Sequence, residues 1–391
     1  MCGPADGILL PLAGDRRLGG PCTLAGTIGK TMSIDFDKRR WDRHRDVYGR
    51  WWAGQLDRPV INVSVRTDRP RRPASALPFH PFTSNYPLDV PAEQIVDAWD
   101  YQLSGYSYPG DSFPYVWVNF GPGVIAEFLG GVAEPGQDTV WFGPADHRPI
   151  EQLELRPRPH SPYLDRILEL YRLAGQRWDG LVQVSMTDLG GNLDILSTFR
   201  EAGQLAMDLY DHPEHVKRLT WEAHEAWFHY FDQMNAVLQP ANPGYTTWCP
   251  IFASQPWYML QCDFSYMISP AMFAEFVRPE LQASCRRLAN SFYHLDGVGQ
   301  LAHLDLLLEM PELNGIQWVP GAGQPDWRHW PDVFRRIRAA GKLIQVYAWP
   351  LETLDVMADQ LGSAAGICLV GEVGRKDDDK LMAMLERYGC T

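Results

Sequence analysis

The sequence predicts an α/β protein, most economically an eight-fold (β/α)8 TIM barrel with an N-terminal helical extension and long loops. Three observations favour this fold. Short apolar runs alternate with segments of helical periodicity along most of the chain. The length of 391 residues is ordinary for such a barrel with additions. Residues 291–323 read as one complete strand, helix and strand, an order that implies a parallel pair with a right-handed crossover.

The segment 291–323 shows each signal in turn. Residues 291–295 form a short aromatic and apolar run, typical of a buried strand. Leucines then recur at helical spacing, at Leu301, Leu304 and Leu308. Residues 315–319 form a second apolar run. The other predicted strands and helices are identified by the same patterns as in this strand-helix-strand unit.

The same pattern recurs from the start of the chain to its end. Nine runs are predicted strands, and they end near Arg66, Asn119, Thr187, Trp248, Asp263, Asp296, Trp318, Tyr347 and Glu372. Helices are predicted over 36–56, 92–101, 163–177, 211–234, 269–277, 301–308, 327–340, 351–361 and 377–388. Because eight strands close the barrel, one of the nine is expected to lie outside it.

Two segments do not follow the pattern. Residues 1–31 are rich in Gly, Pro and small side chains, and we expect a flexible leader that folding and activity do not need. Residues 32–391 are then a single domain. Residues 67–91 are rich in Pro and Arg with few periodic apolar positions, which predicts a long surface excursion able to fold over a site.

Composition narrows the function classes. A net charge of -13 argues against a sequence-independent nucleic-acid binder and against a protein that binds anionic membranes. No apolar run approaches the roughly 18 residues of a membrane span. The seven cysteines are scattered through a large chain, which favours reduced thiols and a cytoplasmic location over a disulfide scaffold.

Polar groups stand where two predicted strands end. His294 and Asp296 are two residues apart, so both side chains point to one face of their strand, at the end where parallel α/β proteins bind ligands. This pair is a candidate for metal binding or proton transfer; the alternative is a turn Asp beside a buried core His. After the run 180–186, Asp188, Asn192 and Asp194 offer oxygen atoms, or else cap the following helix.

Aromatic residues lie near the same strand ends and predict a pocket suited to a flat ring or a methylated cation. They are Tyr245, Trp248, Trp318, Tyr347 and Trp349. The alternative for each of them is packing in the core.

The order of three segments goes beyond a generic barrel. These are residues 182–216, with Asp-Leu-Tyr-Asp-His-Pro-Glu-His-Val at its end, residues 267–273 with Met-Ile-Ser-Pro-Ala-Met-Phe, and the His-Leu-Asp-Gly of 294–297. In order and spacing they resemble the uroporphyrinogen decarboxylase superfamily over roughly residues 55–390. That superfamily includes zinc methyltransferases that serve corrinoid proteins and, more distantly, the barrel of cobalamin-independent methionine synthase.

The resemblance implies a metal site with altered ligands. The methyltransferases carry His-x-Cys at the strand end that aligns here with His294, and Asp296 stands in place of that Cys. Their later Cys falls near Glu372, or alternatively Cys368. A set of His294, Asp296 and Glu372 would still hold zinc. The decarboxylases carry Arg-Gln-Ala-Gly-Arg at the first strand, and this chain keeps only Arg66 after that strand.

The function so implied is a metal-assisted methyl transfer between a small molecule and a corrinoid protein or a thiol. His294, Asp296 and Asp188 are the expected catalytic groups, with Asp188 as a base. The expected substrate-binding groups are Arg66, Asn192, Tyr245, Asp263, Trp318 and Tyr347. Two alternatives are open: decarboxylation of a porphyrinogen or another carboxylated aromatic substrate, and a non-catalytic barrel that binds a tetrapyrrole or a corrinoid protein.

Overall fold

A computed structural model of the chain describes residues 34–67 and 69–391. The predicted leader, residues 1–31, lies outside the described residues. The architecture is α/β with a parallel central sheet. The strands are β1 Val60–Arg66, β2 Tyr106–Ser107, β3 Tyr115–Trp117, β4 Val132–Pro135, β5 Val140–Gly143, β6 Gln183–Ser185, β7 Trp257–Gln261, β8 Asn290–Asp296, β9 Gly315–Val319, β10 Leu343–Tyr347 and β11 Ile367–Gly374.

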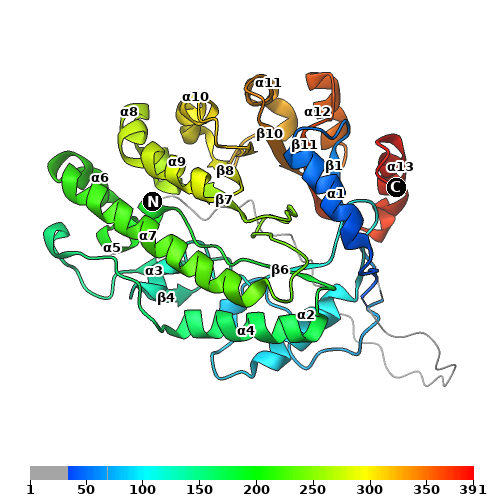
Figure 1. Ribbon diagram of the computed structural model, residues 1–391, viewed down its shortest axis with the longest axis horizontal. Coiled ribbons are helices and arrows are strands. Elements are labelled where there is room, and N and C mark those ends of the chain that lie inside the picture. Colours follow the sequence, from blue (N-terminus) through cyan, green and yellow to red (C-terminus); the bar gives the residue numbers. More distant parts are fainter. Residues whose placement is uncertain (1–33, 68) are drawn as a thin grey trace.

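Helices cover the outer side of these strands (Figure 1). They are α1 Arg40–Trp52, α2 Ala92–Leu103, α3 Ile125–Phe128, α4 Pro162–Trp178, α5 Asn192–Arg200, α6 Ala202–Asp211, α7 Pro213–Leu238, α8 Pro270–Met272, α9 Arg278–Arg287, α10 Leu304–Leu308, α11 Pro331–Ala339, α12 Thr353–Leu361 and α13 Asp378–Arg387. Of the helices in the described part of the chain, none is both long and apolar enough to cross a bilayer.

The main sheet has seven strands in the order β2-β1-β11-β10-β9-β8-β7, and all its pairs are parallel except β1 with β2. A separate parallel pair joins β3 to β6, and β4 with β5 is an antiparallel hairpin. Eight of the nine predicted strands are therefore present among the described residues. The ninth, residues 244–248, forms only an isolated bridge between Tyr245 and Ala253.

A continuous eight-strand ladder is not formed in the described residues, because no ladder joins β1 to β3 or β6 to β7. The physical reason is the shortness of β3 and β6, which have three residues each. The segment 244–248 lies beside β6, where the Thr246 carbonyl accepts a hydrogen bond from the Met186 amide at 3.0 Å. The strands on this side are therefore held partly by loop contacts.

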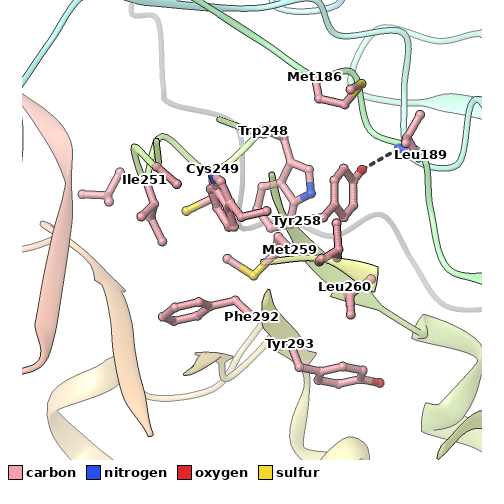
Figure 2. Close-up of a cluster of buried hydrophobic side chains, with 14 of the residues drawn as sticks. Met186, Leu189, Trp248, Cys249, Ile251, Tyr258, Met259, Leu260, Phe292 and Tyr293 are labelled. Atoms are coloured by element: carbon pink, nitrogen blue, oxygen red, sulfur yellow. Dashed lines mark hydrogen bonds between the residues drawn. The ribbon is translucent and has the colours of Figure 1, made fainter. Parts of the chain in front are cut away.

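Side chains alternate between the two faces of β7 and β8, as strand geometry requires. In Figure 2, Met259 and Phe292 point to the side on which Cys249 lies, whereas Tyr258 and Tyr293 point to the other side. The Tyr258 hydroxyl accepts a hydrogen bond from the Leu189 amide at 2.7 Å. One face of these strands is thus interior and the other meets the helical layer.

The helix α1 closes the amino-terminal ends of the strands. Its Trp51 stacks on Phe292 near the start of β8, with ring centroids 5.8 Å apart. Its Trp52 packs on Trp257, the first residue of β7, at 5.4 Å. The predicted N-terminal helical extension is confirmed, and the opposite, carboxyl ends of the strands are left for a ligand.

Residues 69–91 of the Pro-rich segment fold back to these carboxyl ends. The Thr83 amide donates to the Asn119 carbonyl at 2.7 Å, and the Asn119 side-chain amide donates to the Pro81 carbonyl at 3.1 Å. Phe79 and Pro81 line a cavity described below. The excursion expected from composition therefore covers part of a pocket.

Candidate metal centre

Strand register builds the site. His294 of β8 pairs with Gln261 of β7 and with Gln317 of β9, and Gln317 pairs with Gln345 of β10. Residues at one register position of neighbouring parallel strands share a face. All four side chains are buried, so they form one polar row across the interior. Residues two positions further on, at the carboxyl edge, share this face.

Asp263 and Asp296 occupy that next position, after Gln261 on β7 and after His294 on β8. With His294 they form a group whose potential ligand atoms all lie within 4.8 Å of one another. We call Asp263, His294 and Asp296 the ligand triad. The sequence assigned Asp263 to substrate binding, whereas the structure places it beside the two residues expected to bind metal.

The polar row fixes the tautomer of His294. Gln317 donates through its Nε2 to the Gln345 side-chain oxygen, which directs its own Oε1 at His294 Nδ1. A carbonyl oxygen only accepts, so Nδ1 carries the proton and Nε2 keeps its lone pair. A histidine held in this way by a hydrogen bond from its other nitrogen is the usual arrangement of a metal ligand.

Two further carboxylates crowd the ligand triad. Burial raises the pKa of Asp188 to about 7, although the Gly190 amide, which donates to its Oδ1 at 2.9 Å, acts in the opposite direction. Burial also raises the pKa of Asp194, again against backbone amides that donate to it. The protein atoms around Asp263, and then the charges of Asp194, Asp296 and Asp188, raise its pKa well above the usual value.

Asp263 is nonetheless exposed to solvent, so water screens part of the repulsion between its carboxylate and those of Asp188, Asp194 and Asp296. The excess of negative charge remains. The charges that shift the pKa values of Asp188, Asp194 and Asp263 come from other carboxylates and from His294. A bound cation would relieve this repulsion.

Asp194 positions the loop that carries Asp263. Its carboxylate accepts hydrogen bonds from the backbone amides of Asp263 at 3.0 Å and Phe264 at 2.7 Å. Glycine is needed beside it, because a Cβ on Gly191 would lie 2.5 Å from Asp194 Oδ2 and 2.2 Å from the Gln261 carbonyl oxygen. The glycines at 190 and 191 therefore let the chain approach its own neighbours closely.

The residues present fit a divalent cation. The ligand triad offers one imidazole nitrogen and two carboxylate oxygens, and catalytic zinc sites typically use three protein ligands drawn from these groups. Oxygen-rich sets of this kind also accept harder divalent ions. The lone pair on His294 Nε2 and the clustered carboxylates both favour a divalent cation as the ligand of this site.

Glu372 and Cys368 do not lie with the ligand triad. Glu372 Oε2 accepts a hydrogen bond from the Tyr106 hydroxyl at 2.9 Å, and its Oε1 lies 3.9 Å from Arg66. Two strands separate β11 from β8, which is roughly 14 Å along the sheet. Cys368 is fully buried in β11, and burial raises the pKa of its thiol. Their places in the fold remove both from the expected metal set.

Three residues expected to bind substrate face elsewhere. Trp318 is fully buried, and its ring packs on Trp330 at 5.3 Å, because it alternates with the inward-facing Gln317. The Tyr245 carbonyl accepts a hydrogen bond from Trp257 at the start of β7, the end remote from the ligand triad. Asn192 is buried and donates to Glu280 at 2.6 Å.

A cavity of about 200 Å³ lies beside the ligand triad, and we call it the aromatic cavity. Trp248, Tyr347 and Trp349 line it, as the aromatic pattern predicted. Trp248 meets the His294 ring edge-on, with centroids 5.1 Å apart. The Tyr347 hydroxyl lies 3.3 Å from Gln317 Nε2. The ligand triad is not part of the cavity wall, but these contacts join the two.

Sequence reasoning missed Gln317, Gln345 and Tyr106. The two glutamines stand inside apolar strand runs, Gly-Ile-Gln-Trp-Val and Leu-Ile-Gln-Val-Tyr. A polar residue at the same position of two predicted buried strands is a signal that could have found them. No comparable local signal marks Tyr106.

Replacing Gln317 by Leu should weaken metal binding by about 10- to 100-fold, because Nδ1 of His294 would lose the partner that fixes its tautomer. Zinc affinity measured by competition with a chromophoric chelator checks this expectation. Gln360→Leu, on the outer helix α12, is the control and should leave the affinity unchanged. An unaltered affinity in Gln317→Leu would contradict the role assigned to the polar row.

No protein-family model matches the sequence, and no curated protein does. Among solved structures, a methyltransferase from Methanosarcina mazei is similar, with a TM-score of 0.55 and 12% identity, over 85% of this chain and 93% of that chain. At this identity the similarity shows a shared fold.

Proposed function

We propose that this chain is a metal-assisted methyltransferase that moves a methyl group from a small molecule to a corrinoid protein or a thiol. The observation that carries the proposal is the ligand triad, with the Nε2 lone pair of His294 directed by Gln317. The fold shared with a methyltransferase supports it. So does the aromatic cavity next to the site, which offers room for a small molecule.

Asp263, His294 and Asp296 would hold the metal, and zinc suits their nitrogen and oxygen atoms. Lewis acidity is what a divalent metal supplies in such a site: it lowers the pKa of a thiol or polarises the donor's oxygen or nitrogen. The chain's own residues hold the geometry. Asp194 fixes the Asp263 loop, and Gln317 fixes the imidazole.

Asp188 is the group to which we assign proton transfer. Its pKa of about 7 lets it exchange a proton at neutral pH, and its charge is one of those that raise the pKa of Asp263. When a thiol is the acceptor, Asp188 takes the thiol proton. The sulfur lone pair then forms the new bond to the methyl carbon, and the electrons of the broken bond stay with the donor's oxygen or nitrogen.

The charge of the aromatic cavity disfavours the decarboxylase alternative. No lysine or arginine is among the described residues that line it, and Glu372 supplies a negative charge. A substrate with several carboxylates calls for guanidinium groups that pair with each of them. No observation in the described residues favours a porphyrinogen here.

Turnover tests the proposal. Zinc-loaded protein is incubated with methoxy and methylamine donors, and either reduced cobalamin or a small thiol is the acceptor. We expect methylated acceptor, detected by mass spectrometry, and a loss of about 10²-fold or more in His294→Ala. His160→Ala, an exposed histidine, is the control. Donor binding without turnover in the wild type would favour the non-catalytic barrel, and unchanged turnover in His294→Ala would contradict the site.

A further inference from the structure

The aromatic cavity has an unusual lining. Ten of its described side chains are aromatic: Phe79, Trp99, Tyr106, Tyr108, Phe113, Tyr115, Trp117, Trp248, Tyr347 and Trp349. Two of them, Tyr347 and Trp349, stack nearly parallel, with centroids 5.6 Å apart and 11° between the ring planes. Ring faces carry negative partial charge. The cavity wall is therefore apolar and yet attractive to a cation.

Glu372 is the charged residue among the described side chains of this wall. Tyr106 donates its hydroxyl to one carboxylate oxygen at 2.9 Å, which fixes the carboxylate against the cavity. Arg66 lies 3.9 Å from the other oxygen, is 41% exposed and does not line the cavity. An exposed guanidinium at that distance is weakly paired. The negative charge of Glu372 therefore acts on the cavity.

We infer that the aromatic cavity binds a methylated ammonium cation, with Glu372 as its counter-charge. The inference rests on the proposed function, because it names the class of methyl donor. Stacked rings and one carboxylate recognise a cation whose methyl groups prevent strong hydrogen bonding. A neutral ring would gain the apolar contacts but not the electrostatic attraction, and an anion would be repelled by Glu372.

The position of the cavity fits methyl transfer from this cation. Trp248 lines the cavity and also contacts His294, and Tyr347 contacts Gln317. Transfer breaks one carbon–nitrogen bond, and its electron pair stays on nitrogen, so the product is a neutral amine. The acceptor thiolate supplies the pair for the new carbon–sulfur bond.

Calorimetry with two probes of the same shape tests the inference. Choline and 3,3-dimethyl-1-butanol differ by the replacement of nitrogen with carbon, and therefore by one charge. We expect choline to bind the full-length protein at least tenfold more tightly than the alcohol. In Glu372→Gln this preference should fall severalfold, and in Trp349→Leu choline binding should weaken about tenfold. Glu309→Gln, an exposed carboxylate, is the matched control.

The outcomes separate this inference from the proposed function, because binding requires neither metal nor turnover. Equal affinities for the two probes, or no binding of choline, would overturn the cation site even if methoxy donors are turned over. A choline preference that survives in Glu372→Gln and in Trp349→Leu would overturn the assignment of the cavity. Tight choline binding that both variants weaken supports it, whatever the zinc content.

Discussion

Near-stoichiometric zinc in protein purified without added metal will fall to background in three variants, Asp263→Asn, His294→Ala and Asp296→Ala. Each removes one ligand atom from a group whose members lie within 4.8 Å of one another. Glu372→Gln will retain its zinc, because that carboxylate binds Tyr106 instead. The zinc content of the four variants and the wild type is measured by elemental analysis.

Thermal unfolding provides a control for misfolding. Each zinc-free variant should unfold cooperatively, and only the wild type and Glu372→Gln, first stripped of metal with a chelator, should gain stability when zinc is added back. A ligand at 100 times its Kd contributes about 2.7 kcal/mol, which for a chain of this length raises the Tm by roughly 3 °C. Zinc lost in Glu372→Gln but kept in Asp263→Asn would contradict the ligand triad and restore the set expected from the sequence.

The second large effect concerns Asp188. The wild-type kcat/KM with a thiol acceptor should rise with pH as Asp188, whose pKa is raised by burial, loses its proton and becomes a base. Asp188→Asn should lower kcat/KM by about 10²- to 10⁴-fold and abolish that limb of the profile. The control is Asp232→Asn, an exposed carboxylate, whose profile should match the wild type.

The substitution Asp188→Asn, which should lower kcat/KM, should raise the stability of the folded protein. Because the folded-state pKa of Asp188 is raised from 3.8 to about 7, its contribution to stability is fully present below pH 3.8 and is lost as the pH rises through 7. Metal-free Asp188→Asn should therefore be more stable than the wild type at pH 8, by up to roughly 4 kcal/mol. Urea unfolding at pH 5 and pH 8 measures the difference in free energy of unfolding between the wild type and Asp188→Asn. An equal difference at the two pH values would refute the raised pKa.

The sequence by itself determined most of the strands and helices, and it determined that His294 and Asp296 share a face of their strand. Apolar runs and helical spacing located eight strands that the structure contains, since these patterns depend on neighbours within one element. The two-residue period of a strand put His294 and Asp296 on one face, and β8 confirms it. The aromatic pattern likewise indicated Trp248, Tyr347 and Trp349 as pocket residues.

Only the tertiary structure decided which residues from different strands meet. Spacing along the chain carries no information on register between β7 and β8, and that register is what brings Asp263, rather than Glu372, to His294. Trp318 faces the helices because the alternation within β9 is fixed by its pairing to β8. Register and the packing of distant strands are non-local, so the grouping of the ligand triad and the charge of the aromatic cavity emerged only from the fold.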